Sequence, residues 1–253
     1  MPLLEARHLA KTYEHGALAV NNVSFTIERG ETLGLVGESG SGKSTIARMV
    51  TGLIAPTSGE VLFDNQPLTG IPAGKLRQLR RRLQIVFQDP YAALNPRMRV
   101  RDIVAEPLII HRACPHSELR DKVAGLLRAT GLDESATSRY PHEFSGGQRQ
   151  RINIARALAL RPELIVLDEP LSALDVSVAA QIANLLRNLQ RDFSLTYLFI
   201  SHSMPLVRYL STSIAVLHHG RMVEYGSAEQ ICTAPREPYT QTLIAATPEI
   251  RIA

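Results

Sequence analysis

The sequence predicts an α/β fold in which short buried strands alternate with helices. Residues 31–36 and 164–167 form apolar runs, and the second is continuous, as in a parallel-sheet strand covered on both faces. Residues 45–50 and 176–191 repeat their apolar side chains with the spacing of one helix face. A glycine-rich stretch, GESGSGKS at 37–44, stands directly between a predicted strand and a predicted helix.

This glycine-rich stretch has the spacing of a phosphate-binding loop, GxxxxGKS. Glycines allow several backbone N–H groups to point at phosphate oxygens, and the N-terminus of the following helix adds a positive dipole end. Lys43 would reach the β- and γ-phosphates, and the Ser44 hydroxyl would bind Mg2+. The alternative is a flexible loop that has this spacing by chance, which the flanking strand and helix disfavour. We therefore predict that a nucleotide is bound by Gly37, Glu38, Ser39, Gly40, Ser41, Gly42, Lys43, Ser44 and Thr45.

Composition and charge are those of an ordinary globular protein. The 253 residues suffice for one large domain or a domain with a subdomain, and 45% of them are hydrophobic and 21% charged. The net charge of +4 is mild compared with that of a dedicated nucleic-acid binder, so no nucleic-acid partner is expected. The two cysteines, Cys114 and Cys232, lack the spacing of a metal site.

The chain carries no sequence feature of a membrane-spanning or exported protein. No apolar run approaches the roughly 18 residues that a membrane-spanning helix needs. The first residues, MPLLEARHLAKTY, are charged where a signal peptide would be apolar. We therefore expect a cytoplasmic protein.

The N-terminal part predicts a β subdomain around the nucleotide-binding core. Residues 3–13 and 18–27 are strand-like with a turn between them, and residues 60–63 follow as a third strand. Residues 75–82 are rich in Lys and Arg, and we interpret them as a solvated helix face rather than a binding surface.

A helical insertion is predicted between two core strands. From residue 89 to about residue 160 the pattern is helical and is interrupted by prolines. The expected helices lie near 100–110, 117–130 and 146–160, and the further strands of the core at 83–87, 196–201, 214–217 and 221–225, the last two forming a hairpin.

Two carboxylates follow directly after the apolar run at 164–167. Asp168, at the end of the strand, could hold Mg2+, and Glu169 could polarise the attacking water in hydrolysis. An acidic pair that caps the next turn is the alternative. The upstream phosphate-binding loop favours the catalytic interpretation.

A second pair of glycines begins another helix, in FSGGQ at 144–148. Ser145 is a good N-cap, and two glycines at a helix start suggest that a backbone approaches an anion. The nucleotide already has its own helix N-terminus at 42–45, and no second lysine loop accompanies these glycines. We therefore expect this segment to serve a nucleotide on another subunit.

The stretches FSGGQRQRINIARAL and LIVLDEPLSALD resemble the ATPase subunit of ABC transporters, and the resemblance covers most of the chain in the family's order. It implies a P-loop NTPase (RecA-like) core with an antiparallel β subdomain and a helical subdomain. The ATPase domain would span 1–235. Its core and β subdomain would occupy about 1–88 and 161–235, its helical subdomain about 89–160, and a short tail 236–253.

The same resemblance implies roles for residues that are weak signals on their own. Tyr13 would stack on adenine, although it could be an ordinary strand aromatic. Gln88 would contact Mg2+ and the attacking water, although glutamine at a strand end is often only a polar terminus. His202 would touch the γ-phosphate, although a lone histidine after a strand is usually structural. Asp175 matches the D-loop aspartate.

Further family positions complete the implied site. The signature that contacts the nucleotide of another subunit is Ser145, Gly146, Gly147 and Gln148; the Mg2+ ligands are Ser44, Gln88 and Asp168; and the catalytic residues are Glu169, His202 and Gln88. The chain departs from the family's usual residues at Phe144, Leu171 and Ser203. None of these departures removes a catalytic group, so a competent site is expected.

For the mechanism, the resemblance implies two ATPase subunits stacked head to tail, with each ATP between the P-loop of one and the signature of the other. ATP binding would close this dimer, and hydrolysis assisted by Glu169 would open it. Two membrane permease subunits would dock in a groove between the core and the helical insertion, near Gln88. Residues 88–108 would lie on that groove.

Two stretches outside the ATP chemistry, IVFQDPYAALNPR and APREPYTQTLIAATP, resemble the peptide and nickel importer branch. The cargo would be a dipeptide, an oligopeptide, nickel or a related metal chelate, delivered by an extracytoplasmic substrate-binding protein that this subunit meets only indirectly. The dimer could contain two copies of this chain or two different ATPases, peripheral to the cytoplasmic face of the membrane. ATP and Mg2+ are the expected cofactors. No iron–sulfur cluster is expected, since no cysteine cluster follows the tail.

Two alternatives belong to other functional classes. One is an ABC-type ATPase of DNA repair or translation, which would usually carry a coiled-coil, zinc-binding or tandem-ATPase insertion. The other is a nucleotide-binding regulatory module without turnover, which the presence of Glu169 disfavours.

Overall fold

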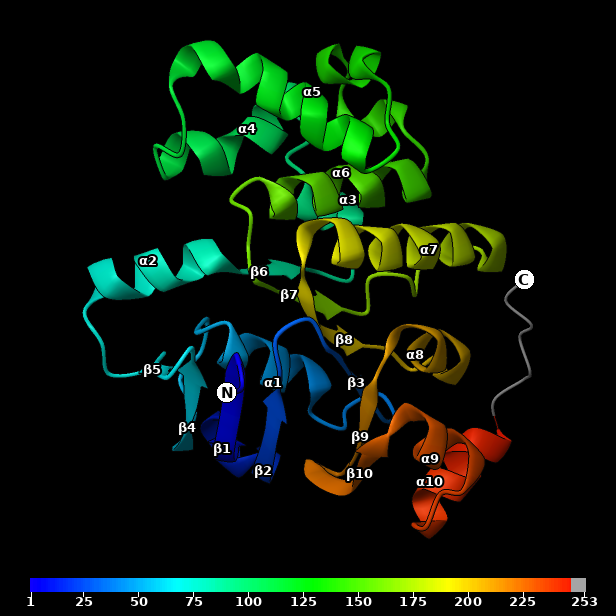
Figure 1. Ribbon diagram of the computed structural model, residues 1–253. Helices are drawn as coiled ribbons and strands as arrows, with labels where there is room; N and C mark the ends of the chain where they lie inside the picture. Colours follow the sequence, from blue (N-terminus) through cyan, green and yellow to red (C-terminus); the bar gives the residue numbers. More distant parts are fainter. Residues whose placement is uncertain (247–253) are drawn as a thin grey trace.

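The computed structural model describes residues 1–246, and for His15 the backbone alone. Its strands form two sheets (Figure 1). The first is antiparallel with the order β2-β1-β4-β5, and the second has the order β10-β9-β3-β8-β7-β6. The strands of the first sheet are β1 (Leu4–Thr12), β2 (Leu18–Ile27), β4 (Ser58–Phe63) and β5 (Gln66–Pro67).

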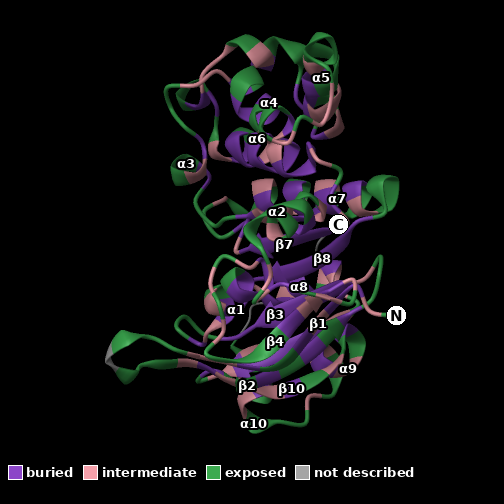
Figure 2. Cartoon of the chain, turned by 90° about the vertical axis from the view of Figure 1, so that its left-hand side faces the viewer, coloured by how far each residue is buried: buried purple, intermediate pink, exposed green. Residues whose placement is uncertain are grey.

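The second sheet is the core that the apolar runs predicted. Its strands are β3 (Thr32–Val36), β6 (Leu83–Val86), β7 (Leu164–Asp168), β8 (Thr196–Ile200), β9 (Ser213–His218) and β10 (Arg221–Ser227). All neighbours pair in parallel except β9 and β10, which form the predicted antiparallel hairpin. Every residue of β3, β7 and β8 is buried, and Figure 2 shows this sheet in the interior.

Side chains on the two faces of this sheet enter two different clusters. Leu164 and Val166 pack with the antiparallel sheet and α1 (Lys43–Val50), whereas Ile165 and Leu167 pack with the helices on the other face. This is the period of two that a strand imposes on its side chains. The helices of the second face are α7 (Val176–Phe193), α8 (Met204–Leu210), α9 (Ala228–Thr233) and α10 (Pro238–Ala245), together with the C-terminal part of α6 (Gly146–Leu158).

A third cluster of buried side chains lies among the helices of the insertion, at the top of Figure 1. The helices there are α3 (Pro90–Ala93), α4 (Val100–Ile110), α5 (Leu119–Ala129) and α6 (Gly146–Leu158), with the 3-10 helices η2 (His116–Glu118), η3 (Glu134–Ser138) and η4 (Pro141–Glu143). They confirm the predicted helices to within two residues. The exact domain boundaries at 88/89, 160/161 and 235/236 stay a prediction.

The short elements were not predicted. The 3-10 helix η1 (Glu14–Gly16) lies in the β1–β2 turn, and α8, α9 and α10 are six to eight residues long. Helices of this length hold barely two turns, so they leave little periodicity in the sequence. Helix α10 lies within the segment that we expected to be only a tail, and the rest of that segment, 247–253, lies outside the described residues.

The basic segment forms the helix α2 (Ala73–Arg82), and the interpretation of a solvated face is wrong for its last turn. Arg82 donates hydrogen bonds to Asp64 at 2.6 Å and to Glu163, and Arg29 pairs with the same two carboxylates. Arg80 donates to the carbonyl oxygen of Gly52. This ion cluster joins the β subdomain to the start of β7, because tertiary contacts engage charges that the sequence pattern alone leaves free.

Candidate nucleotide site

The loop between β3 and α1 has the backbone that only glycine adopts easily. Gly37 has φ 149° and Gly42 has φ 103°, both in the left-handed half of the map. A Cβ on Gly37 would lie 2.2 Å from the carbonyl oxygen of Leu217, and one on Gly42 would lie 2.4 Å from that of Ala19. Conformation and space therefore both require glycine at these two positions.

Lys43 is buried in this loop with only 5% of its surface exposed. Its ammonium donates hydrogen bonds of 2.8 Å to the carbonyl oxygens of Gly37 and Glu38. Burial lowers the pKa of Lys43, while the nearby carboxylates of Glu169 and Asp168 oppose this shift. The cation is thus held by carbonyl dipoles at the place where a phosphate would be a stronger partner.

Ser44 and Asp168 meet beside this lysine. The Ser44 hydroxyl donates a 3.0 Å hydrogen bond to Oδ1 of Asp168. Asp168 is buried at the end of β7, and burial raises its pKa, while the hydrogen bond from Ser44 opposes the shift. A hydroxyl and a carboxylate are oxygen ligands of the kind that Mg2+ prefers, so this pair could hold that ion.

Glu169, the first residue after β7, has an unusual backbone conformation. Its φ of 50° is left-handed, a conformation that costs of order 1 kcal/mol for a residue other than glycine. Its N–H donates to the carbonyl oxygen of Ile200, and its carboxylate oxygen Oε2 lies 2.7 Å from Nδ1 of His202. Two of the predicted catalytic side chains, 33 positions apart in sequence, are therefore in direct contact.

One cavity of about 630 Å3 collects nine of the nineteen predicted site residues. It is lined by Ala19, Ser39, Gly40, Gly42, Lys43, Ser44, Thr45, Gln88, Glu169 and His202. Gln88 also lines an adjacent cavity of about 270 Å3, together with Phe87, Asp89 and Asp168. Tyr13 lies at the edge of the site, 40% exposed, with its hydroxyl 3.4 Å from Oγ1 of Thr45.

The predicted signature is not among the residues that line this cavity. Ser145 is exposed and caps α6 in a reciprocal pair with Gln148: its Oγ accepts from the Gln148 N–H, and Oε1 of Gln148 accepts from the Ser145 N–H. A Cβ on Gly147 would lie 2.5 Å from Cγ1 of Val178. Close packing of α6 on α7 therefore also favours glycine at this position, independently of any bound anion.

Other predicted residues of the region are placed as follows. Asp175 is exposed at the N-terminus of α7, outside the cavity. Of the three departures from the family's usual residues, Phe144 and Leu171 are buried, and Ser203 donates its N–H to Oγ of Ser201. These contacts leave Glu169 and His202 in place.

Sequence reasoning missed one contact of the loop. The hydroxyl of Tyr239 in α10 accepts a 3.1 Å hydrogen bond from the N–H of Glu38. The tail motif EPYTQTL, which we noted only for its resemblance to importers, was the signal that could have drawn attention to it.

Comparisons with known proteins agree with this architecture. Residues 20–172 match the family model described as ABC transporter, and residues 223–253 match the one described as oligopeptide/dipeptide transporter, C-terminal region. The chain is 50% identical over 251 residues to the oligopeptide transport ATP-binding protein OppF of Bacillus subtilis (strain 168), covering 97% of this chain and 82% of that protein. It is 48% identical over 253 residues to the dipeptide transport ATP-binding protein DppF of Lactococcus lactis subsp. cremoris (strain MG1363), covering 97% and 81%.

Solved structures give the same result. The cbiO1 protein of Clostridium perfringens, described as part of the ABC transporter complex cbiONQ, has a TM-score of 0.82 and 30% identity over 91% of this chain and 90% of that one. A dimeric ATP-binding cassette in a post-hydrolysis state, bound to ADP and Pi, has a TM-score of 0.81 and 32% identity over 89% and 98%. The chain therefore belongs to the ABC transporter family, as an ATP-binding and ATP-hydrolysing subunit of its peptide-importing group.

Proposed function

We propose that this subunit powers the import of peptides as one half of an ATP sandwich, with each ATP held between its P-loop and the signature of a second ATPase subunit. The observation that carries the proposal is the division of the site. Lys43, Ser44, Gln88, Glu169 and His202 share one cavity, whereas Ser145, the exposed N-cap of the signature helix, lies outside it.

Within one subunit, each of these residues has a role at the phosphates. The ammonium of Lys43, held on the carbonyl oxygens of Gly37 and Glu38, would bind the β- and γ-phosphates. Ser44, Asp168 and Gln88 would hold Mg2+, and Tyr13 would stack on the adenine. Glu169 would orient the attacking water, and its contact with His202 supports a role for that histidine at the γ-phosphate.

The second subunit would supply the phosphate contacts that the residues lining the cavity do not provide. Ser145, the N–H groups of Gly146 and Gly147, and the N-terminus of α6 would approach the γ-phosphate of the facing chain, where a helix N-terminus favours an anion. Asp175 lies near the same exposed edge at the start of α7 and would face the partner. The partner is a second copy of this chain or a different ATPase of the same family.

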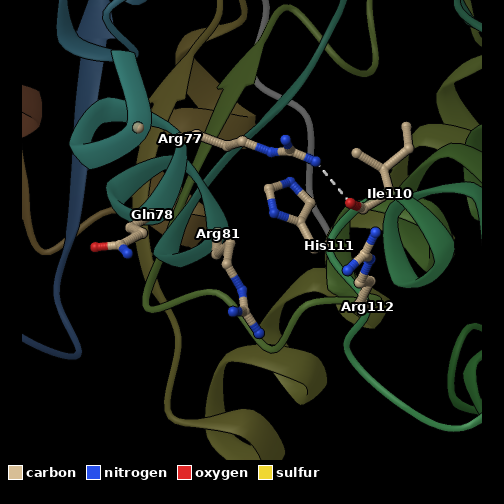
Figure 3. A pocket seen from close by; sticks show the side chains of 7 residues that line it. Arg77, Gln78, Arg81, Ile110, His111 and Arg112 are labelled. Atoms are coloured by element: carbon tan, nitrogen blue, oxygen red, sulfur yellow. Dashed lines mark hydrogen bonds between the residues drawn. The ribbon is translucent and has the colours of Figure 1, made fainter. Parts of the chain in front are cut away.

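The permease subunits would dock beside Gln88, between the core and the helical insertion. Large apolar side chains are exposed at Phe87, which lines a cavity together with Gln88, at the nearby Tyr91, and at Ile109 and Ile110 at the end of α4. Ile110 also lines a cavity of about 410 Å3, together with Arg77 and Arg81 of α2 and with His111 and Arg112 after α4 (Figure 3). No carboxylate lines it within the described part of the chain, so a partner segment that carries acidic side chains fits this surface.

The names of the relatives indicate the class of the cargo. The curated relatives that we cite are named for oligopeptide and dipeptide transport, which supports peptides over nickel or a metal chelate as the substrate. A substrate-binding protein outside the membrane would deliver them to the permeases. Between residues 1 and 246 the structure holds no helix of the length and apolarity that crossing a membrane requires. We place the subunit on the cytoplasmic face, bound through the permeases.

The test of the sandwich is ATP-driven pairing. The full-length Glu169→Gln chain, with Mg2+ and ATP, should shift from monomer to dimer in size-exclusion chromatography with light scattering, alone or with its companion ATPase. Adding Ser145→Arg should abolish the shift while leaving ATP binding intact. An Arg191→Ala chain, changed at an exposed residue of α7, is the matched control. Unaltered pairing in the Ser145→Arg chain would contradict the proposal.

A further inference from the structure

Helix α10 of the C-terminal region reaches the P-loop. Tyr239, in its first turn, accepts a 3.1 Å hydrogen bond from the N–H of Glu38 through its hydroxyl. The two residues are 201 positions apart in sequence, and Tyr239 belongs to the segment that matches the oligopeptide/dipeptide transporter C-terminal region rather than the part that matches the ATPase family model. The nucleotide site therefore has a contact from outside the shared ATPase part of the chain.

This contact acts on the peptide group that Lys43 also holds. The N–H of Glu38 and the carbonyl of Gly37 belong to one planar trans peptide, so they point in opposite directions. Tyr239 binds the N–H end, and the ammonium of Lys43 binds the carbonyl end at 2.8 Å. A rotation of this peptide would break both bonds together.

The peptide needs such an anchor because Gly37 does not fix it. Glycine can adopt many more backbone conformations than other residues, so no side chain of its own enforces the φ of 149° at Gly37, and ordering this residue costs the most conformational entropy. The carbonyl oxygen of Leu217 blocks one side, 2.2 Å from where a Cβ would stand. Lys43 restrains the carbonyl end of the peptide, and the Tyr239 hydroxyl restrains its N–H end.

Tyr239 is itself held on two sides. Its ring stacks on that of His218, which follows Leu217 at the end of β9, with 3.9 Å between centroids and 18° between planes. The carboxylate of Glu224 in β10, which is only 8% exposed, accepts hydrogen bonds from the N–H groups of Arg236 and Glu237 at 2.8 and 3.2 Å. These bonds fix the start of α10 and with it the position of the tyrosine.

We propose that Tyr239 is a positioning residue of the ATP site: its hydroxyl keeps the Gly37–Glu38 peptide oriented so that the P-loop is already shaped for the triphosphate. The proposal rests on the proposed role of Lys43. A loop that is ordered before binding loses less entropy when the ligand arrives, so the hydroxyl strengthens ATP binding without touching the nucleotide.

The experiment measures Mg-ATP affinity by calorimetry on the full chain in a Glu169→Gln background, where hydrolysis does not interfere. Tyr239→Phe removes the hydroxyl and keeps the ring on His218. We expect the Kd to rise about two- to tenfold, the range of one hydrogen bond. In the assembled transporter, the KM for ATP should rise by a similar factor while kcat at saturating ATP stays near that of the unmodified protein.

Three measurements separate positioning of the P-loop from general stability. Tyr225→Phe makes the same chemical change at an exposed residue of β10 whose hydroxyl has no hydrogen bond among the described residues, and it should leave the Kd unchanged. The melting temperature of nucleotide-free Tyr239→Phe should match that of the parent. In a Lys43→Ala chain, measured at millimolar ATP, the fold-change in Kd caused by Tyr239→Phe should differ from that in the parent, because the two side chains act through one peptide.

An unchanged Kd in Tyr239→Phe would overturn the inference. So would the same loss of affinity with and without Lys43, or a melting temperature that falls enough to explain the loss. A failure of the proposed P-loop role would be seen separately, as an unchanged Kd in Lys43→Ala alone.

Discussion

The P-loop side and the signature side of this molecule are built differently. On the P-loop side, the ammonium of Lys43 is held by its own loop, and the Ser44 hydroxyl and the carboxylates of Asp168 and Glu169 have partners within the same chain. On the signature side, Ser145 is exposed and its hydroxyl serves only its own helix. One side brings its predicted residues together in one chain, and the other is a surface that, in our proposal, serves a second subunit.

This difference explains why the two sides should respond differently to substitution. Changes on the P-loop side should alter how one chain binds or cleaves ATP. Changes on the signature side should leave binding by a single chain intact and affect what happens when two chains meet. The predictions below test this separation, beginning with the largest expected effect.

Glu169→Gln should slow ATP hydrolysis on the P-loop side while leaving ATP binding intact. The amide cannot accept a proton from the attacking water, and loss of a general base reduces the rate by about 10²- to 10⁴-fold. Phosphate release measures the rate, and calorimetry measures ATP affinity, which should stay within a factor of a few. Normal turnover would refute the role assigned to this carboxylate.

Lys43→Ala, on the same side, should weaken the binding of ATP. Loss of charge-assisted hydrogen bonds to phosphates, each worth about 1.5–3 kcal/mol, should weaken ATP affinity about 10- to 100-fold or more. Lys75→Ala, which removes an exposed lysine from α2, is the matched control. Unchanged affinity in the Lys43 variant would remove the phosphate role from the loop.

Gly147→Ala should disturb the signature side. Its new Cβ would lie 2.5 Å from Cγ1 of Val178, and overpacking of this kind costs about 1–3 kcal/mol of unfolding free energy. Gly125→Ala, in α5 with nothing within 4 Å of its added Cβ, should be neutral or stabilising. Adding Val178→Ala to Gly147→Ala should restore most of the loss in urea unfolding. Equal stabilities for both glycine variants would show that α6 and α7 do not pack as described.

The ion cluster of Arg29, Arg82, Asp64 and Glu163 belongs to neither side, so its loss should affect stability and not ATP binding. Hydrogen bonds from Arg82 lower the pKa values of both carboxylates. Because the folded pKa values are depressed, this stabilisation is present above the unfolded values near pH 4 and is lost as the pH falls through the folded values.

The measurement is the unfolding free energy of Arg82→Gln across pH. The four side chains are roughly one-third to one-half exposed, so the loss at pH 7 should be only about 1 kcal/mol or less. The difference from the parent should shrink toward pH 3. A difference that grew as the pH fell would contradict the sign of these shifts.

The two sides were also unequally predictable from the sequence. The P-loop could be predicted because its backbone requires glycine at fixed spacing. Asp168 and Glu169 could be predicted because they directly follow an apolar strand. The core strands followed from continuous apolar runs, and the capped start of α6 from a serine before two glycines.

Tertiary contacts were not predictable in this way. No local pattern shows that Lys43 folds back onto the carbonyls of Gly37 and Glu38, or that His202 meets Glu169. The approach of Tyr239 to the P-loop depends on α10, a helix too short to leave a periodic signal. Val178, which explains Gly147 through packing, is likewise a neighbour only in space.

The central claim is that the ATP site is completed by a second subunit, and the dependence of hydrolysis on concentration tests it most directly. The rate per chain should fall on dilution below the dissociation constant of the pair, and it should be restored by adding the partner chain. Hydrolysis at the full rate by an isolated monomer, independent of its concentration and of any second chain, would contradict the account.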